Sequence, residues 1–397
     1  MAERAGGVGR ALLRPILSHV CLHTCMTGTR LAAPLLALSQ GYSAAAVGVL
    51  LALFAVVQIF LALPAGRYAD RHGLKRPVGY SILVAGFGAG VALLYPVFPV
   101  LCLSALLTGG ATGVAMIAVQ RHVGRLARTP VELKTSFSWL AIAPSTSNFL
   151  GPFCAGLLID HAGSVPGDTT GYRGAFLMMT VMPLLAWLLV RGVPEQSTRG
   201  APADPNAPKA WDMLRDPLFL RLMVVNLLLA SCWDVHSFAV PLLGHERGFS
   251  ATVIGSILGA FAIAATAVRV LIPIVATRIH EWAMITAAMA GTALALAIYP
   301  LQNSAIGMGL CSVLMGFTLG MTQPMVMSTL HQITPEARQG EALGLRMMTI
   351  TVSSVVMPIM FGSLGSLIGI PGLFWIVSGV LVLSLRSGWK LKFGKTH

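Results

Sequence analysis

The residues most able to do chemistry in this sequence are ionisable side chains set inside long apolar segments. His23 and Arg30 lie in the first of these segments, and Asp234 and His236 lie in a later one with the polar Asn226. Charged groups in such surroundings are costly and mark binding or proton-transfer sites by default. A carboxyl group can release a proton, and a histidine titrates near neutral pH. We predict that Asp234 is a proton site assisted by His236, and that Arg30 pairs with Asp234 or binds an anionic group. The alternative is that these side chains lie near solvated segment ends.

The stretch HVCLHTCM at residues 19–26 has the residue types of a metal site but not the spacing. His19 and His23 share one helical face, whereas Cys21 and Cys25 share another, about 200° away. One ion cannot reach both faces of a straight helix, so we predict no metal and no cofactor. The six Cys of the chain all lie in apolar segments and are interpreted as packing residues rather than disulfide partners.

A second cluster of charge lies in the stretch GRYADRHGLKR at residues 66–76. Its residues of interest are Gly66, Asp70, Arg71, Gly73, Lys75 and Arg76. Four bases and one acid are concentrated here in a chain of which only 10% is charged. Gly66 allows close packing of a helix, and Gly73 allows a tight turn. The acid is the informative residue, because a signal for membrane orientation alone needs only the bases.

The elements that must position these residues are membrane helices. The 397 residues are 55% hydrophobic, and their mean hydropathy is +0.78. A soluble domain has about a quarter of its residues charged, so this chain cannot cover a water-facing surface. A membrane helix needs roughly 20 apolar residues. We predict an all-α membrane protein with twelve spans at about 11–38, 43–65, 77–96, 98–120, 134–159, 173–191, 217–243, 250–274, 281–300, 302–330, 340–368 and 370–388.

The basic residues predict the orientation of these spans. All except four of the 27 Lys and Arg residues fall on one side of the predicted membrane map. Lys and Arg in short loops stay cytoplasmic, so both termini are predicted to be cytoplasmic in a multi-pass protein of the bacterial inner membrane type. The same topology explains the net charge of +13. We therefore predict no nucleic-acid partner.

A weak internal repeat divides the chain into two halves. The stretch QGYSAAAVG at 40–48 matches RGFSATVIG at 247–255, and Pro34 and Pro241 keep the same offset. GPFCAG at 151–156 likewise matches MPIMFG at 357–362. Segment 192–216 is rich in Pro, Ala and polar residues, which is typical of a linker. We predict a six-helix bundle over 1–191, a cytoplasmic linker over 192–216, and a second, pseudo-symmetric six-helix bundle over 217–397. Parallel repeats with a site between them belong to one transporter design.

Over nearly its whole length the chain resembles the major facilitator superfamily. The stretch 66–76 resembles that family's signature between spans 2 and 3, with Leu74 in place of a usual base. The resemblance implies that Asp70 lies at a helix end against span 11, near Arg121 or Arg125, and closes the cytoplasmic side. We call this Asp70 contact the latch. Because Thr277 replaces the acid in the second half, the latch is expected to be one-sided, with an acid in the first half alone.

Residues 147–160, SNFLGPFCAGLLID, resemble the antiporter motif of proton-driven exporters in the same family. Gly151, Pro152 and Gly156 match it, and Ser147 replaces a glycine. Proline bends a helix and small residues allow close packing. An ordinary kinked helix is the alternative.

Together these patterns predict a secondary transporter that exports a small organic solute in exchange for protons and acts as a monomer. A proton-coupled importer or a uniporter is the alternative. An enzyme is not expected, because the short loops hold no catalytic constellation. ATP is not the expected driving force, since the chain lacks a Gly-x-x-x-x-Gly-Lys loop. The identity of the solute is not readable from the sequence.

Overall fold

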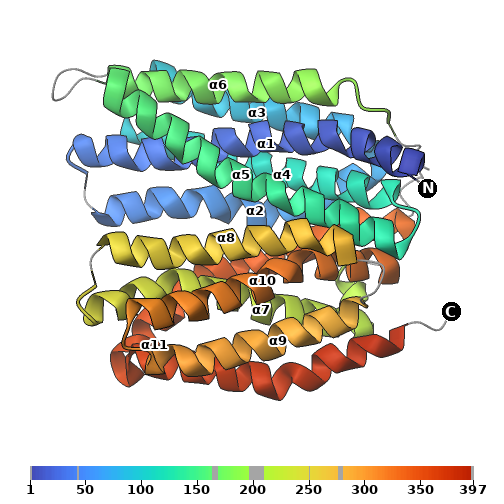
Figure 1. Ribbon diagram of the computed structural model, residues 1–397. Helices are drawn as coiled ribbons and strands as arrows, with labels where there is room; N and C mark the ends of the chain where they lie inside the picture. Colours follow the sequence, from blue (N-terminus) through green and yellow to red (C-terminus); the bar gives the residue numbers. More distant parts are fainter. Residues whose placement is uncertain are drawn as a thin grey trace. The chain divides into compact units, whose positions relative to one another are not determined.

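The fold was obtained as a computed structural model, which describes residues 2–42, 44–162, 169–195, 210–249, 251–275 and 280–394. All regular structure in these ranges is helical (Figure 1). The α-helices are α1 (Ala2–Ser39), α2 (Ala44–His72), α3 (Lys75–Leu94), α4 (Phe98–Leu126), α5 (Pro130–Ala162), α6 (Thr170–Val190), α7 (Pro217–Glu246), α8 (Ala251–Val275), α9 (Glu281–Ile298), α10 (Ala305–Ile333) and α11 (Gln339–Trp389). Short 3-10 helices are η1 (Ala210–Arg215), η2 (Tyr299–Leu301), η3 (Glu336–Arg338) and η4 (Lys390–Gly394).

Ten helices of the described residues are long and apolar enough to cross a membrane. They correspond to ten of the predicted spans; the first span, in α1, and the eleventh, in the first part of α11, are not among them. The backbone of α11 leaves helical geometry at Gly369, where φ is +73°. Glycine adopts this left-handed conformation at little cost, so the expected break between the last two spans lies at Gly369. The number twelve stays a prediction.

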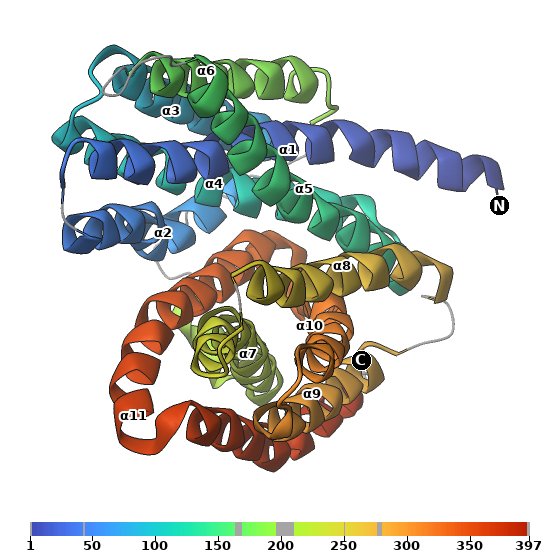
Figure 2. The same ribbon diagram turned by 60° about the vertical axis from the view of Figure 1, so that its left-hand side comes forward.

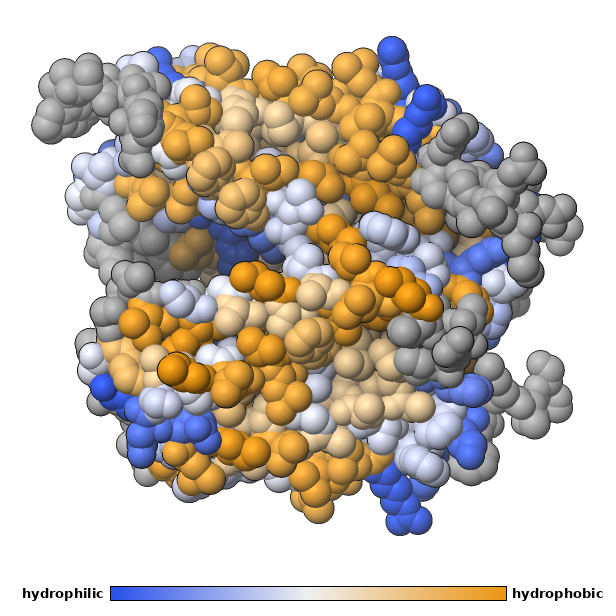
Figure 3. Space-filling view, viewed as in Figure 1, coloured by the Kyte–Doolittle hydropathy of each residue, from blue (hydrophilic) through white to orange (hydrophobic). Residues whose placement is uncertain are grey.

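The apolar residues of the spans also cover the outer surface. On α6, exposed side chains include Leu177, Val181, Leu184 and Leu188. The corresponding region over α3 and α6 is mainly hydrophobic in Figure 3, at the top of the view. A water-soluble protein rarely exposes an apolar surface of this extent, so this face suits a bilayer.

The chain forms two compact units that exchange one segment each. The first unit contains residues 1–126, 142–207 and 336–351, and the second contains 127–141, 208–335 and 352–397. The start of α5 thus belongs to the second unit, and the start of α11 belongs to the first. Within the second unit, Figure 2 shows α7 inside an arc formed by α9, α10 and the later part of α11.

Packing within the two units repeats at the same register as the sequence. In the first unit, Gly109 of α4 lies so close to the carbonyl oxygen of Phe54 in α2 that a Cβ would overlap it. In the second unit, Gly316 of α10 has the same relation to Phe261 of α8. Both members of each pair are offset by 207 positions, as Gly41 and Gly248 are. The internal repeat is therefore present in the helix packing.

The close approach at Gly316 predicts a selective effect of substitution. Gly316→Ala forces backbone atoms of α8 and α10 apart and should lower the free energy of unfolding by about 1–3 kcal/mol. Gly309→Ala is the matched control on the same helix, because no atom lies within 4 Å of its added Cβ. Unfolding of the purified protein by sodium dodecyl sulfate in mixed micelles measures both. Equal stability of the two variants would refute the close packing.

Candidate functional site

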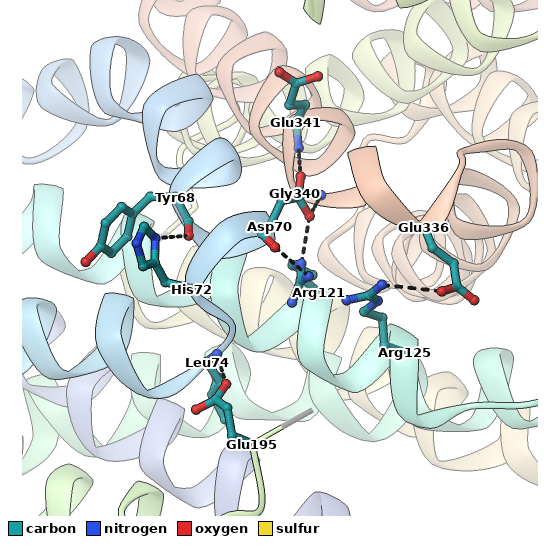
Figure 4. Close-up of polar contacts among 10 residues, drawn as sticks. All are labelled: Tyr68, Asp70, His72, Leu74, Arg121, Arg125, Glu195, Glu336, Gly340 and Glu341. Atoms are coloured by element: carbon teal, nitrogen blue, oxygen red, sulfur yellow. Dashed lines mark hydrogen bonds and ion pairs between the residues drawn. The ribbon is translucent and has the colours of Figure 1, made fainter. Parts of the chain in front are cut away.

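The turn between α2 and α3 is built by Gly73 and a distant acid. Gly73 has a φ of +75°, and its N–H donates to the carbonyl of Ala69 at 2.9 Å. The N–H groups of Leu74 and Lys75, at the start of α3, donate to the carboxylate of Glu195 at 2.5 and 3.1 Å. Glu195 follows α6 and satisfies donors that a helix start leaves free (Figure 4). The glycine is used as predicted, whereas Glu195 was missed.

Asp70, at the end of α2, is held by three donors from two other helices. Its Oδ1 accepts from the N–H of Gly340 at 2.9 Å and from Nε of Arg121 at 2.7 Å. Its Oδ2 accepts from the N–H of Glu341 at 3.2 Å. Gly340 and Glu341 lie in the first turn of α11, where free N–H groups and the helix dipole favour an anion. Figure 4 shows the carboxylate between α4 and the start of α11.

The Asp70–Arg121 pair is buried, and the ion pairs around it are less so. The side chains of Asp70 and Arg121 are 9% and 2% exposed. Arg125, the other expected partner, instead contacts Glu336 at 3.3 Å, and the Glu336 side chain is 83% exposed. Exposed pairs contribute little to stability, whereas removing one member of a buried pair is costly. Asp70 is therefore the energetic centre of the cluster.

Glycines bring α2 and α11 together around Asp70. A Cβ added at Gly66 would overlap the carbonyl of Gly340, and one added at Gly340 would overlap Gly66 and the Asp70 carboxyl group. Gly344 has the same relation to the backbone of Ala62. The first residue of the motif thus lets two backbones approach closely enough for Asp70 to reach the N-terminus of α11.

Three bases of the motif take no part in this contact. Arg71 and Arg76 are exposed, and Lys75 is half-buried. In the ranges that the structure describes, none of the three forms an ion pair. Their position fits the predicted role in orientation, and it leaves them available for other ligands.

A second charged junction lies in the second unit, at the start of α5. Nζ of Lys134 lies 3.8 Å from Oε1 of Glu281, and both side chains are nearly buried, at 7% and 8% exposed. The same Oε1 accepts from Gln332 at 2.7 Å and from Ser328 at 3.1 Å. Ser138, one turn along α5, donates to the backbone carbonyl of Arg269.

This junction leaves the expected one-sidedness of the Asp70 contact a prediction. The prediction compared Asp70 with Thr277, which lies outside the described residues together with Arg278. A different acid of the second unit, Glu281, lies at the start of α9. Because Glu281 comes after the compared turn, the register of the repeat could not reveal it.

The predicted antiporter-like residues lie where α5 packs on α1. A Cβ at Gly151 would overlap Thr27 and the backbone of Gly28. Ser147 donates to the carbonyl of Val20 at 3.1 Å, and its own carbonyl accepts from Thr27 at 2.8 Å. Pro152 lies inside α5 without breaking it, and a Cβ added at Gly156 would lie 4.0 Å from the Leu31 side chain of α1. These residues serve close helix packing; their part in export stays a prediction.

Asp234 lies on α7 and faces the part of α11 that belongs to the second unit. Its carboxylate accepts from the hydroxyl groups of Ser353 at 3.3 Å and Ser354 at 3.5 Å. Ser353 also lies 3.0 Å from the hydroxyl of Ser231. Asp234 is half-buried, so the acid has polar partners and an accessible side.

His236 faces a different part of the second unit. Its Nε2 lies 2.9 Å from the Ser312 hydroxyl, which is 2.8 Å from the hydroxyl of Tyr299. Its ring stacks on Phe261 at 4.1 Å. Positions two apart on a helix point about 200° apart, so Asp234 and His236 do not form one site.

The other predicted residues are spread over both units. In the first unit, His23 stacks on His19 at 5.6 Å, and Arg30 is exposed. In the second, Asn226 is buried. No group of three or more His, Cys, Asp or Glu side chains that could hold a metal ion occurs among the described residues.

Comparisons with known proteins show a family match and a shared fold. The model of the Major Facilitator Superfamily matches residues 16–304 and 222–391. A bacterial homologue of the iron transporter ferroportin in an outward-facing state has a TM-score of 0.79 at 17% identity, over 96% of this chain and 99% of that one. The human organic anion transporter MFSD10 (TETRAN) has a TM-score of 0.77 at 17% identity, again over 96% and 99%. The proton:xylose symporter XylE has 0.73 at 17%, over 99% and 98%. No curated protein sequence matches.

The burial difference between the two ion pairs of the first unit predicts different effects of removing each acid. Asp70→Asn leaves the buried Arg121 without its counter-charge and should lower the free energy of unfolding by about 3–5 kcal/mol. Glu336→Gln removes an exposed pair and should cost about 0–1 kcal/mol. Detergent-denaturation titrations of the two variants make the comparison. If Glu336→Gln were the more damaging change, the burial argument would fail.

Proposed function

Because the chain belongs to the Major Facilitator Superfamily, we propose that it is a secondary transporter that exports a small organic solute in exchange for protons. Its family and fold are those of transporters that move a solute across a membrane. Efflux and proton coupling are the further steps of the proposal. The observation that carries it is the Asp70 carboxylate bound to the N-terminus of α11.

The Asp70 contact suits alternating access because one carboxylate group holds three helices together and is costly to remove. It joins α2, α4 and α11 through one carboxylate group. Breaking it leaves Arg121 and two helix N–H groups without an anion, which penalises the open state. Binding of solute or protons elsewhere must therefore favour the open state by more than the free energy of breaking this contact. In the proposal this cluster closes the cytoplasmic end of the pathway.

Proton coupling is assigned to Asp234. It is an acid within a membrane helix, and its hydroxyl partners Ser353 and Ser354 can hydrogen-bond a protonated or an ionised carboxyl group. α11 carries Ser353 and also Gly340, thirteen residues earlier, without a backbone break between them. A change in protonation at Asp234 therefore acts on the same helix that binds Asp70.

The direction of transport is supported by the packing of α5 on α1. Ser147, Gly151, Pro152 and Gly156 keep the small-residue pattern of exporters, and Gly151 makes the closest approach. The structural neighbours include an iron transporter homologue, an organic anion transporter and a sugar symporter. The fold therefore does not identify the solute. Arg30 remains the candidate contact for an anionic group of the solute.

In the proposed orientation, both termini and the loops rich in Lys and Arg lie in the cytoplasm. A single cysteine at Asn303, between η2 and α10, should react with an impermeant thiol reagent added outside intact cells. A cysteine at the exposed Arg128, between α4 and α5, should react only after the cells are opened. The test uses a variant in which the native cysteines are replaced. The reverse pattern would overturn the orientation.

Asp234→Asn tests the function. The neutral amide keeps the volume of the side chain but cannot carry a proton. We expect inside-out vesicles with this variant to exchange labelled solute at equal pH and to lose accumulation driven by a proton gradient. The solute comes from a screen of the unaltered protein with and without the gradient. Asp212→Asn is the control, because Asp212 lies in η1 and pairs with Arg215.

Two results would contradict the coupling role. If Asp234→Asn kept full gradient-driven accumulation, Asp234 would not be the residue that carries the coupled proton. Loss of exchange together with accumulation makes Asp234 a solute ligand or a structural residue instead.

A further inference from the structure

An apolar groove runs along the outside of the first unit between α3 and α6. Its volume is about 500 Å³, and it is lined by Lys75, Arg76, Gly79, Tyr80, Ile82, Leu83, Leu184 and Trp187. α3 and α6 lie side by side in Figure 1. A Cβ at Gly79 would touch the ring of Trp187 at 3.3 Å, so this glycine keeps the groove open.

The groove is charged at one end only, where the two bases Lys75 and Arg76 outnumber the single carboxylate of Glu195. Lys75 and Arg76 form the first turn of α3, and Ile82 and Leu83 lie about two turns further along. Within the described ranges neither base is in an ion pair. The motif therefore contains two cations that the Asp70 contact does not use, and both lie at one end of the apolar groove.

Aromatic side chains mark the same end as a membrane–water boundary. Tyr80 is exposed at the groove, and its ring lies 6.1 Å from that of Tyr68, which stacks on His72 at 4.2 Å. Trp187 forms the opposite wall and is 41% exposed. Tyr and Trp are enriched where a membrane helix meets the headgroup layer.

We propose that this groove binds one anionic phospholipid, with its phosphate and headgroup on Lys75 and Arg76 and an acyl chain along Leu83 and Leu184. The charge complementarity selects an anionic lipid, since basic pockets between membrane helices bind anionic headgroups. The apolar walls select a chain-bearing ligand over a free anion. The site adjoins the turn held by Gly73 and Glu195, so the lipid braces the end of α2 that carries Asp70.

Native mass spectrometry of the full-length protein in detergent tests the site. The probes are dioleoyl phosphatidylglycerol and dioleoyl phosphatidylcholine, which share their acyl chains. The unaltered protein should retain one phosphatidylglycerol, preferred about tenfold or more, because each base near an anionic headgroup adds to affinity. Lys75→Gln/Arg76→Gln should lose most of this preference. Arg128→Gln/Arg386→Gln, which removes two exposed bases elsewhere, should keep it.

A second variant tests the acyl-chain part of the groove without changing charge. Leu83 is 69% exposed, so Leu83→Trp fills the groove without disturbing the core. It should reduce phosphatidylglycerol retention severalfold while the protein stays folded.

Three outcomes overturn the proposal. One is equal phosphatidylglycerol preference in Lys75→Gln/Arg76→Gln and the unaltered protein. Another is displacement of the lipid by inorganic phosphate alone, which makes the site a free-anion site. The third is a dimer that Leu83→Trp dissociates, which makes a second copy of the chain the occupant.

Discussion

The interaction on which the rest of this structure depends is a single carboxylate placed at the start of a helix. Asp70 satisfies two N–H donors of α11 and neutralises Arg121, whose side chain is 2% exposed. Leaving such a cation unpaired in a buried position costs several times more than an exposed ion pair contributes. The small residues follow from this need, because Gly66, Gly340 and Gly344 let the two backbones come within reach. The conformation at Gly73 then turns the chain into α3 directly after the contact.

The internal repeat gives two versions of one junction with different chemistry. The start of α11 belongs to the first compact unit, and the start of α5 belongs to the second. In the first unit the crossing helix offers backbone N–H groups to an acid. In the second it offers the cation of Lys134 to Glu281. The packing repeats in both units, as Gly109 and Gly316 show, whereas the charged residues of the two junctions differ. The two junctions can therefore be weakened independently by substitution.

Local and periodic features were predictable from the sequence. Long apolar runs predicted the helices, and the matches around Gly41 and Gly248 predicted the repeat. The resemblance supplied the region around Asp70. The missed residues, Glu195 and Glu281, meet partners more than a hundred positions away, and no spacing within one helix reports such a contact. The separation of Asp234 from His236 was available from helical periodicity alone, because residues two positions apart on a helix point about 200° apart.

The central claim is that the junction of α2 with α11 closes the pathway and must open in each cycle. Arg67 and Glu341 flank Asp70, and their side chains meet at 2.7 Å. Cysteines at these two positions, in a chain without its native cysteines, can be joined by a short bifunctional methanethiosulfonate reagent that spans the space of the two side chains, and released by a reductant. We expect the cross-linked protein in vesicles to stop transporting solute and to recover when reduced. Undiminished transport by the fully cross-linked protein would contradict it.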